Sequence, residues 1–212
     1  MNEWKTSINN SRDLLLKLSA RDMKGQDIDT DLAFKYLKNY TLGILERRKT
    51  IYFVGNGASA SIANDASVNL AKNTSLNTET FFNFSLLTAI ANNSSYEEIF
   101  AAPLRKKMVS GDMLIAISSS GQSQNIINAA REALRIGGSI CTLSAMNPEN
   151  SLRSLGTLNF FIPAEYPGNA HLCHMEIMNY WIDQMISTVS WQEDLKETYT
   201  SNYIAKTVYN NF

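Results

Sequence analysis

The sequence SSSGQSQN at residues 118–125 lies between an apolar run, MLIAI at 113–117, and a helical pattern over 123–136. Gly121 permits a tight turn, and the helix that begins near Ser123 presents unpaired backbone N–H groups and the positive end of its dipole. With the serine hydroxyls, these groups predict a neutral binding site for a phosphate group. A serine-rich turn with an ordinary helix cap at Ser123 is the alternative interpretation. The serine loop, as we call residues 118–125, offers the hydroxyls of Ser118, Ser119, Ser120 and Ser123.

A second loop, GNGASASIAND at residues 55–65, follows the apolar run IYFV, and we call it the glycine loop. Gly55 and Gly57 allow backbone conformations that other residues resist, and the next helix presents its N-terminus to the same space. The side chains of Asn56 and Ser59 add hydrogen-bonding groups. The glycine loop is therefore a second candidate for contact with a polar or anionic ligand.

From residue 50 onward, short apolar runs alternate with stretches of helical periodicity. This alternation is typical of a parallel β-sheet with helices on both faces, which is a three-layer α/β sandwich. In such sheets the ligand lies at the carboxyl ends of the strands, where both loops fall. The expected strands are 51–54, 80–82, 113–117, 139–143 and 158–162, and the expected helices are 58–72, 84–91, 123–136 and 170–189.

Two helical patterns precede this core and predict an N-terminal helical arm. The first includes Trp4 and Ile8, and the second runs from Leu32 to Leu45. Such an arm either serves oligomerisation or covers the sheet. The polar and aromatic C-terminal tail either docks on a neighbour as a final helix or is partly loose. The expected division is an arm at 1–48, a core domain at 49–190 and a tail at 191–212.

The composition limits the possible binding partners and the cellular compartment of the protein. The formal net charge of −1 and the charged fraction of 18% give no electrostatic reason to expect nucleic acid or an anionic membrane as a partner. The sequence has neither the roughly 20 consecutive apolar residues of a membrane helix nor a signal peptide at its N-terminus. Cys141 and Cys173 match no zinc or redox spacing, so we expect both to be reduced and buried in a cytoplasmic protein.

Three other motif classes fit less well. Gly55, Gly57 and Ala60 match the dinucleotide fingerprint G-x-G-x-x-G/A. The acidic residue that should end the second strand is misplaced, because Glu79 precedes the apolar run TFF instead of following it. No lysine follows either loop as in a P-loop, and no G-x-S-x-G elbow occurs. The sequence thus argues against a dinucleotide enzyme, a nucleoside triphosphatase and an α/β-hydrolase.

The two loops together resemble the sugar isomerase (SIS) domain, and within it the phosphoheptose isomerase group. The family's first motif is similar to GNGGSAxxAxHxAxEL, and residues 55–70 read GNGASASIANDASVNL. Its second is similar to GISTSGNSxNVxxAxxxAxxxG, and residues 116–137 read AISSSGQSQNIINAAREALRIG. Between them, NNSSYEEIF at 92–100 looks like a short ND…F segment of the family. The resemblance extends from about residue 30 to residue 189.

This resemblance implies a five-stranded parallel sheet in a flavodoxin-like order and a homotetramer with active sites between subunits. The implied reaction converts sedoheptulose 7-phosphate to D-glycero-D-manno-heptose 7-phosphate, or a related aldose–ketose pair. Asn93 stands where the family usually has Asp. The implied positions for sugar-phosphate contact are Asn56, Gly57, Ala58, Ser59, Asn93, Ser118, Ser119, Ser120 and Ser123.

The resemblance implies a catalytic site with zinc and an acid/base pair. Four positions of this chain depart from that pattern. The first motif of the family supplies a His and then a Glu, where this chain has Asp65 and Asn69. The last helix supplies a Gln and then a His, where the best ungapped match gives His171 and Asn179, with His174 on a second family histidine. Aldose–ketose isomerisation needs a base and an acid, and an amide is neither. The usual mechanism is therefore unavailable at Asn69 and Asn179.

A remodelled catalytic site would use the two ionisable replacements. Asp65 and His171 are both metal-ligand types, and an exchanged Asp/His pair would hold zinc or a similar ion, although catalytic zinc usually has three protein ligands. In the competing interpretation Asp65 lies on a helix surface, and His171 and His174 bond to backbone at the start of the last helix. Glu176 is a further candidate base, on another face of that helix.

Two functional hypotheses follow from these observations. In the first, the protein is an isomerase of a phosphorylated seven-carbon sugar or a relative of it, with Asp65 and His171 as catalytic residues. In the second, it is a non-catalytic relative that binds a sugar phosphate or a protein partner as a regulatory tetramer. One branch of the family resembles this second case and binds a replication initiator protein. The two loops predict ligand binding under either hypothesis, and the ligand we expect is a sugar phosphate.

Overall fold

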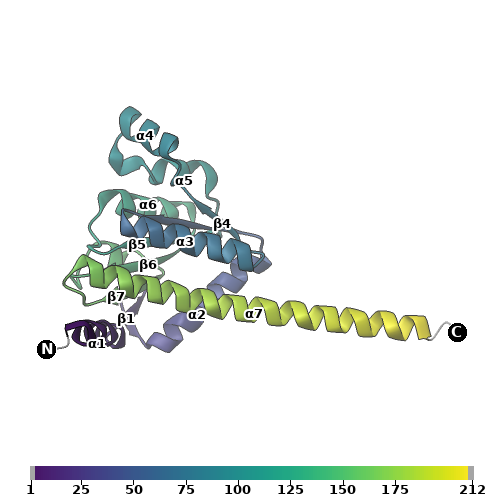
Figure 1. Cartoon of the computed structure of the whole chain (residues 1–212). Coiled ribbons are helices and arrows are strands. Elements are labelled where there is room, and N and C mark those ends of the chain that lie inside the picture. The colour runs from purple at the N-terminus through teal and green to yellow at the C-terminus, as the bar shows by residue number, and fades with distance from the viewer. Residues whose placement is uncertain (1–2, 210–212) are drawn as a thin grey trace.

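The computed structural model describes residues 3–209, which fold around a seven-stranded sheet in the order β2-β1-β7-β6-β5-β3-β4 (Figure 1). Two strands, β1 (Ser19–Asp22) and β2 (Asp27–Ile28), pair antiparallel at the β7 edge. The five expected parallel strands are thus present in a flavodoxin-like order, but the prediction missed the antiparallel pair that makes the whole sheet mixed and seven-stranded. The parallel strands are β3 (Thr50–Gly55), β4 (Asn77–Thr80), β5 (Met113–Ser118), β6 (Ser139–Ala145) and β7 (Leu158–Ile162).

The two additional strands form a hairpin between α1 (Glu3–Leu16) and α2 (Thr30–Glu46). Their sequences, SARD and DI, are too short and too polar to show the alternation that identifies a strand. The Asp22 carboxylate stabilises the turn, because it accepts hydrogen bonds from the backbone N–H groups of Lys24 (2.8 Å) and Gln26 (2.9 Å). The N-terminal arm thus contains two helices joined by a hairpin that extends the sheet.

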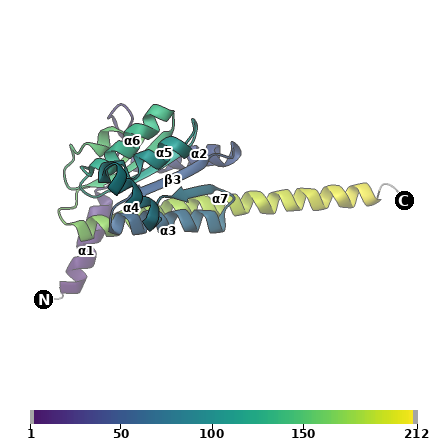
Figure 2. The ribbon, with the colours of Figure 1, turned by 90° about the horizontal axis from the view of Figure 1, so that it is seen from above.

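Helices cover both faces of the sheet, as the strand–helix alternation predicted. α3 (Ala58–Asn73) and α7 (Pro167–Tyr209) lie side by side on one face, and α5 (Ala101–Lys107) and α6 (Gln124–Ile136) cover the other (Figure 2). α2 packs against α7 and shares the core cluster of α3 and α7. Side chains of β3 point alternately to the two faces of the sheet. Ile51 and Phe53 pack in the core on the α3 and α7 side, and Tyr52 and Val54 pack in the core on the α5 and α6 side. Burial on both faces explains why β3 reads as a continuous apolar run.

The second parallel strand is displaced from its expected position. We expected residues 80–82, but β4 ends at Thr80, and Phe81 and Phe82 follow it. β4 is an edge strand with the polar sequence NTET, whereas Phe81 is buried in the core cluster on the α6 side of the sheet. The apolar signal therefore belonged to the connection that leads to α4 (Phe84–Asn93) and to the short helix η1 (Tyr96–Glu98).

The last helix is the longest element, with 43 residues in α7 and a length of about 65 Å. Its first half packs on the body, and its second half extends well beyond the body (Figure 1). The helix continues without a break into the expected tail as far as Tyr209, and residues 210–212 of that tail lie outside the described part. The division into arm, core domain and tail stays a prediction. No helix within residues 3–209 has both the length and the apolar character needed to cross a bilayer.

Candidate functional site

A cavity of about 230 Å³ lies at the carboxyl ends of β3 and β5. The chain order of the parallel strands reverses between these two strands, which is where ligands bind in open α/β sheets. The glycine loop follows β3 and the serine loop follows β5, so parallel pairing brings both loops to this edge. The lining residues are Asn56, Ser59, Ile117, Ser118, Ser119, Ser120, Ser123, Met146, Pro167 and His171.

The two helices that begin at this cavity lack side-chain caps. Ser123 occupies the N-cap position of α6, but its hydroxyl makes no capping bond and instead accepts from Ser118 Oγ at 3.3 Å. The interpretation of Ser123 as an ordinary helix cap is therefore wrong. α3 begins after Gly57 (φ 54°), which has no side chain to cap with. By contrast, Asp29 caps α2 and Asn83 caps α4. Helix ends without side-chain caps leave backbone N–H groups for an anionic ligand.

The glycine of the serine loop is required by its conformation and by its surroundings. Gly121 has a φ of 63°, which disfavours any residue with a Cβ atom. A Cβ atom at this position would also lie 1.9 Å from Oδ1 of Asn150. The backbone of the loop is held by the N–H of Leu152, which donates to the carbonyl of Gly121 at 3.0 Å. The serine loop therefore packs directly on the segment that follows β6.

A reciprocal amide pair joins the two loops. Asn56 Nδ2 donates to Asn125 Oδ1 at 2.9 Å, and Asn125 Nδ2 donates to Asn56 Oδ1 at 2.8 Å. The hydroxyl of Tyr96 also donates to Asn56 Oδ1, at 3.3 Å. We did not expect Asn125 or Tyr96 in the site, although the family motif contains an Asn at the position of Asn125. The orientation of Asn56 is thus fixed by groups outside the cavity.

The four positions of the expected catalytic set do not come together. His171 is half-buried and lines the cavity from the first turns of α7. Asp65 and Asn69 lie on α3 outside the lining, and Asn69 Nδ2 donates to the Asp65 carboxylate at 3.0 Å. Asn179 is exposed on α7 about two turns beyond His171 and is also outside the lining. Of this set, the cavity of a single chain contains only His171.

Only some of the nine positions expected to contact the sugar phosphate line the cavity. Six of the nine are part of the lining, whereas Gly57, Ala58 and Asn93 are not. Gly57 and Ala58 are exposed at the start of α3, beside the cavity, and Asn93 is the last residue of α4. Three apolar lining residues carried no chemical signal in the sequence: Ile117, Met146 and Pro167.

The described residues do not fit a zinc site. Within residues 3–209, no group of three or more His, Cys, Asp or Glu residues is arranged to hold a metal ion. The Asp65 carboxylate is engaged with Asn69, and His171 faces the cavity among serine hydroxyls. Because catalytic zinc usually has three protein ligands, the expected Asp65–His171 pair is too small a set within one chain. We therefore derive no chemical step from a bound metal.

Comparison with known proteins identifies the family of this chain and several relatives. The family model described as "SIS domain" matches residues 33–145. The phosphoheptose isomerase of Helicobacter pylori (strain HPAG1) is 34% identical over 131 residues, which are 57% of this chain and 66% of the relative. The matched stretch thus spans just under two thirds of that relative's length. The phosphoheptose isomerase of Shewanella denitrificans is 31% identical over 158 residues, which cover 69% of this chain and 79% of the relative.

The fold is also similar to that of solved structures. The phosphoheptose isomerase GmhA from Neisseria gonorrhoeae superposes with a TM-score of 0.75, covering 86% of this chain and 97% of that chain. Sequence identity in this pair is 20%, so the likeness concerns the fold alone.

Proposed function

The chain belongs to the SIS domain family, and we propose that its cavity binds a phosphorylated sugar with the phosphate group on the serine loop. The observation that carries this proposal is that four serines of the serine loop line the cavity, directly before a helix that begins without a side-chain cap. Hydrogen bonds from such donors to a charged phosphate are stronger than those between neutral groups. The sequence relatives described above are phosphoheptose isomerases, which supports a sugar-phosphate ligand.

The cavity binds the phosphate group mainly through neutral donors in this proposal. Among the described residues, its lining contains no Lys or Arg side chain, and His171 is its one titratable residue. The positive end of the α6 dipole and the serine hydroxyls then balance the negative charge of the ligand. The sugar chain extends from the serine loop towards the start of α7, where Pro167 and His171 lie.

We further propose an aldose–ketose isomerase in which His171 transfers the proton. The imidazole removes a proton from C1 of the bound ketose, sedoheptulose 7-phosphate or a relative, and an enediol forms. The same imidazole returns the proton to C2, while the hydroxyl proton of the former C1 alcohol passes to the former carbonyl oxygen. One base suffices because the two carbons are adjacent. Asn69 and Asn179 take no part in this scheme, since neither lines the cavity.

A non-catalytic, sugar-phosphate-binding protein is the second candidate function. It is favoured by the amide side chains at both family acid/base positions, one of which, Asn69, is hydrogen-bonded to Asp65. Under either function we propose a homotetramer, as the family resemblance implies. We also propose a cytoplasmic location, in line with Cys141 and Cys173, which are buried and unpaired.

Turnover separates these two functions. Sedoheptulose 7-phosphate is incubated with the protein at high concentration, with and without added zinc, and the sugar is followed by NMR. The isomerase proposal predicts conversion that His171→Ala abolishes and that the matched control Glu176→Gln retains. Glu176 is a suitable control because it lies on the same helix but lines a different groove, with Leu15, Phe34 and Tyr180. Absent conversion with ligand-dependent line broadening would instead support a binding protein.

Phosphate recognition is tested independently of turnover. In the double variant Ser120→Ala/Ser123→Ala, each hydrogen bond lost to a charged group costs roughly 1.5–3 kcal/mol of binding free energy. We expect the affinity for the sugar phosphate to fall at least a hundredfold. Ser187→Ala, an exposed serine of α7 outside the cavity, serves as the control. Unchanged affinity in the double variant would refute phosphate binding at the serine loop.

A further inference from the structure

Asn150 lies outside the cavity lining, directly behind the serine loop. We infer that Asn150 is a positioning residue that holds the serine loop in its ligand-binding conformation, and that Arg153 connects this support to strand β1. We call residues 145–153 the support segment. The inference rests on the proposed role of the serine loop in phosphate binding.

The amide of Asn150 is fixed on three sides. The residue is 2% exposed, and its Nδ2 donates to Ser144 Oγ at 3.1 Å and to the carbonyl of Asn147 at 2.7 Å. Its Oδ1 accepts from the backbone N–H of Arg153 at 3.0 Å. This same oxygen occupies the space that a side chain at Gly121 would need. The turn of the serine loop therefore rests on an amide that is held by its other bonds.

Backbone and side-chain bonds join the two segments on either side of this contact. The N–H of Ala145 donates to the carbonyl of Ser119 at 2.9 Å, and the N–H of Leu152 donates to the carbonyl of Gly121 at 3.0 Å. Ser151 Oγ donates to Gln122 Oε1 at 2.8 Å. The serine loop is thus held from behind, while Ser118, Ser119, Ser120 and Ser123 line the cavity.

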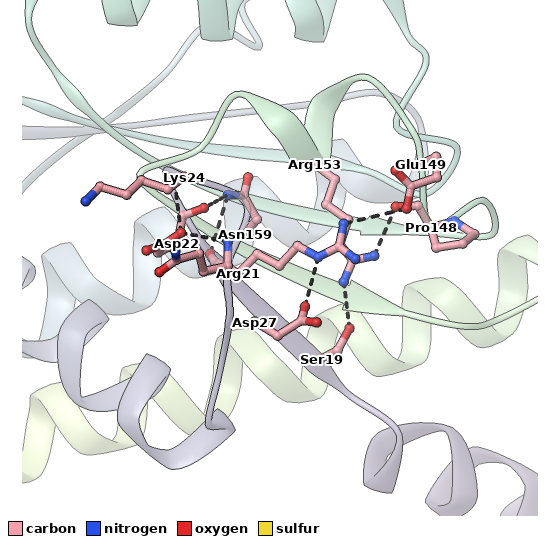
Figure 3. A network of polar contacts seen from close by, with 10 residues as sticks. Ser19, Arg21, Asp22, Lys24, Asp27, Pro148, Glu149, Arg153 and Asn159 are labelled. Carbon is pink, nitrogen blue, oxygen red and sulfur yellow. Dashed lines mark hydrogen bonds and ion pairs between the residues drawn. The ribbon is translucent and has the colours of Figure 1, made fainter.

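Arg153 connects the support segment to the N-terminal hairpin (Figure 3). Its side chain is almost completely buried and donates to the carbonyl of Pro148 at 3.0 Å and to Ser19 Oγ at 2.9 Å. The guanidinium lies 4.3 Å from the ring centroid of Phe161 on β7. Ser19 begins β1, so the guanidinium fixes the turn at 148–153 against the sheet edge that the hairpin adds.

The neighbouring Arg21 has a different role in the same region. It pairs with the carboxylates of Asp27 (2.9 Å) and Glu149 (3.7 Å), both of which are mostly exposed. Exposed ion pairs contribute little to stability. Arg153 instead has a buried planar group with fixed partners, and burial lowers its pKa. The connection between hairpin and serine loop therefore depends on Arg153 more than on Arg21.

The experiment compares Asn150→Ala with two controls. Asn147→Ala changes an exposed asparagine of the same segment, whose Oδ1 accepts from the N–H of Glu149 at 2.9 Å and not from the serine loop. Thr41→Ala removes the buried bond between Trp181 Nε1 and Thr41 Oγ1 (3.2 Å) in the α2–α7 layer. Two quantities are measured by NMR on the full chain. One is the hydrogen-exchange rate of the Gly121 and Leu152 amides without ligand, and the other is the affinity for inorganic phosphate.

In Asn150→Ala we expect exchange at Gly121 and Leu152 to accelerate at least tenfold and phosphate affinity to fall at least fivefold. Asn147→Ala should change neither quantity. Thr41→Ala should lower the melting temperature while phosphate affinity stays as in the wild type, which separates positioning from general loss of stability. If Asn150→Ala does not fold, Asn150→Ser, whose hydroxyl can still accept from the Arg153 N–H, is measured in the same way.

Different results would overturn the positioning role of Asn150 and the proposed phosphate binding. Wild-type exchange and wild-type phosphate affinity in folded Asn150→Ala would overturn the positioning role and leave the proposed function standing. Absent phosphate binding by the wild type, with accelerated exchange in Asn150→Ala, would overturn the proposed function and support the structural link between Asn150 and the serine loop.

Discussion

The Nε2 atom of His174 lies 3.2 Å from the carbonyl oxygen of Ser144, and both residues are completely buried. This distance indicates that Nε2 carries the proton and donates it to the carbonyl. Burial lowers the pKa of His174 to about 4, so the imidazole is neutral at physiological pH. His174 thus fixes the end of β6, where the support segment begins, and does not face the cavity.

This burial predicts a specific loss of stability in acid. A histidine in the unfolded chain has a pKa of about 6.5, so the unfolded state binds more protons than the folded state between pH 6.5 and 4. The stabilising contribution of the neutral folded form is complete above pH 6.5 and is lost as the pH falls towards 4. We expect His174→Gln to show a shallower decline of the free energy of unfolding over this range. Urea denaturation at several pH values measures it, and equal slopes in both proteins would contradict the assignment.

Replacing Gly121 should be costly for two separable reasons. Gly121→Ala forces a residue with a Cβ atom into a left-handed conformation and towards Asn150 Oδ1, so we expect a loss of roughly 2 kcal/mol or more in the free energy of unfolding. Gly25→Ala is the matched control, because Gly25 has a similar φ of 75° but no atom within 4 Å of the position that a Cβ atom would take. Chemical denaturation compares them, and an equal loss in both variants would show that the contact with Asn150 contributes nothing.

The amide pair between the loops predicts a linked loss of stability and binding. Asn125→Ala leaves the Asn56 amide without its reciprocal partner, which costs about 1–3 kcal/mol of stability. We expect the affinity for a sugar phosphate to fall as well, since Asn56 lines the cavity. Asn128→Ala, one turn further along α6, is the control, as it removes bonds to Gln124 and to the Glu97 carbonyl only. A variant at Asn125 that binds as the wild type does would contradict a coupling of the two loops.

The proposed homotetramer has a simple physical signature. Light scattering at micromolar concentration should give a mass of about 95 kDa, which is four times 23.7 kDa. A mass near that of a single chain would count against active sites between subunits.

The positions of the two loops were predictable from the sequence because they depend on local signals. The strands before these loops appear as the continuous apolar runs IYFV and MLIAI, and each run is followed by a loop rich in glycine or serine and then by a helix. The polar strands of the N-terminal hairpin have no such pattern. β4 is a polar edge strand, and the two phenylalanines that follow it shifted the predicted strand towards the C-terminus.

The supporting contacts were not predictable, because they join residues far apart in the chain. Nothing near Arg153 in the sequence indicates that it bonds to Ser19, 134 positions away. Asn150 resembles any asparagine of a turn until the fold places it against Gly121. The spacing of Asp65 and Asn69 did allow a hydrogen bond between neighbouring helical turns, which is what the structure contains instead of a metal site.

The length of α7 has a mechanical consequence. The helix begins with residues that line the cavity and ends far outside the body (Figure 1). A stiff rod of about 65 Å amplifies rotation at its base, so each degree of tilt moves its far end by about 1 Å. A small tilt of α7 at the cavity would therefore be detected most easily as a displacement of the opposite end of this helix.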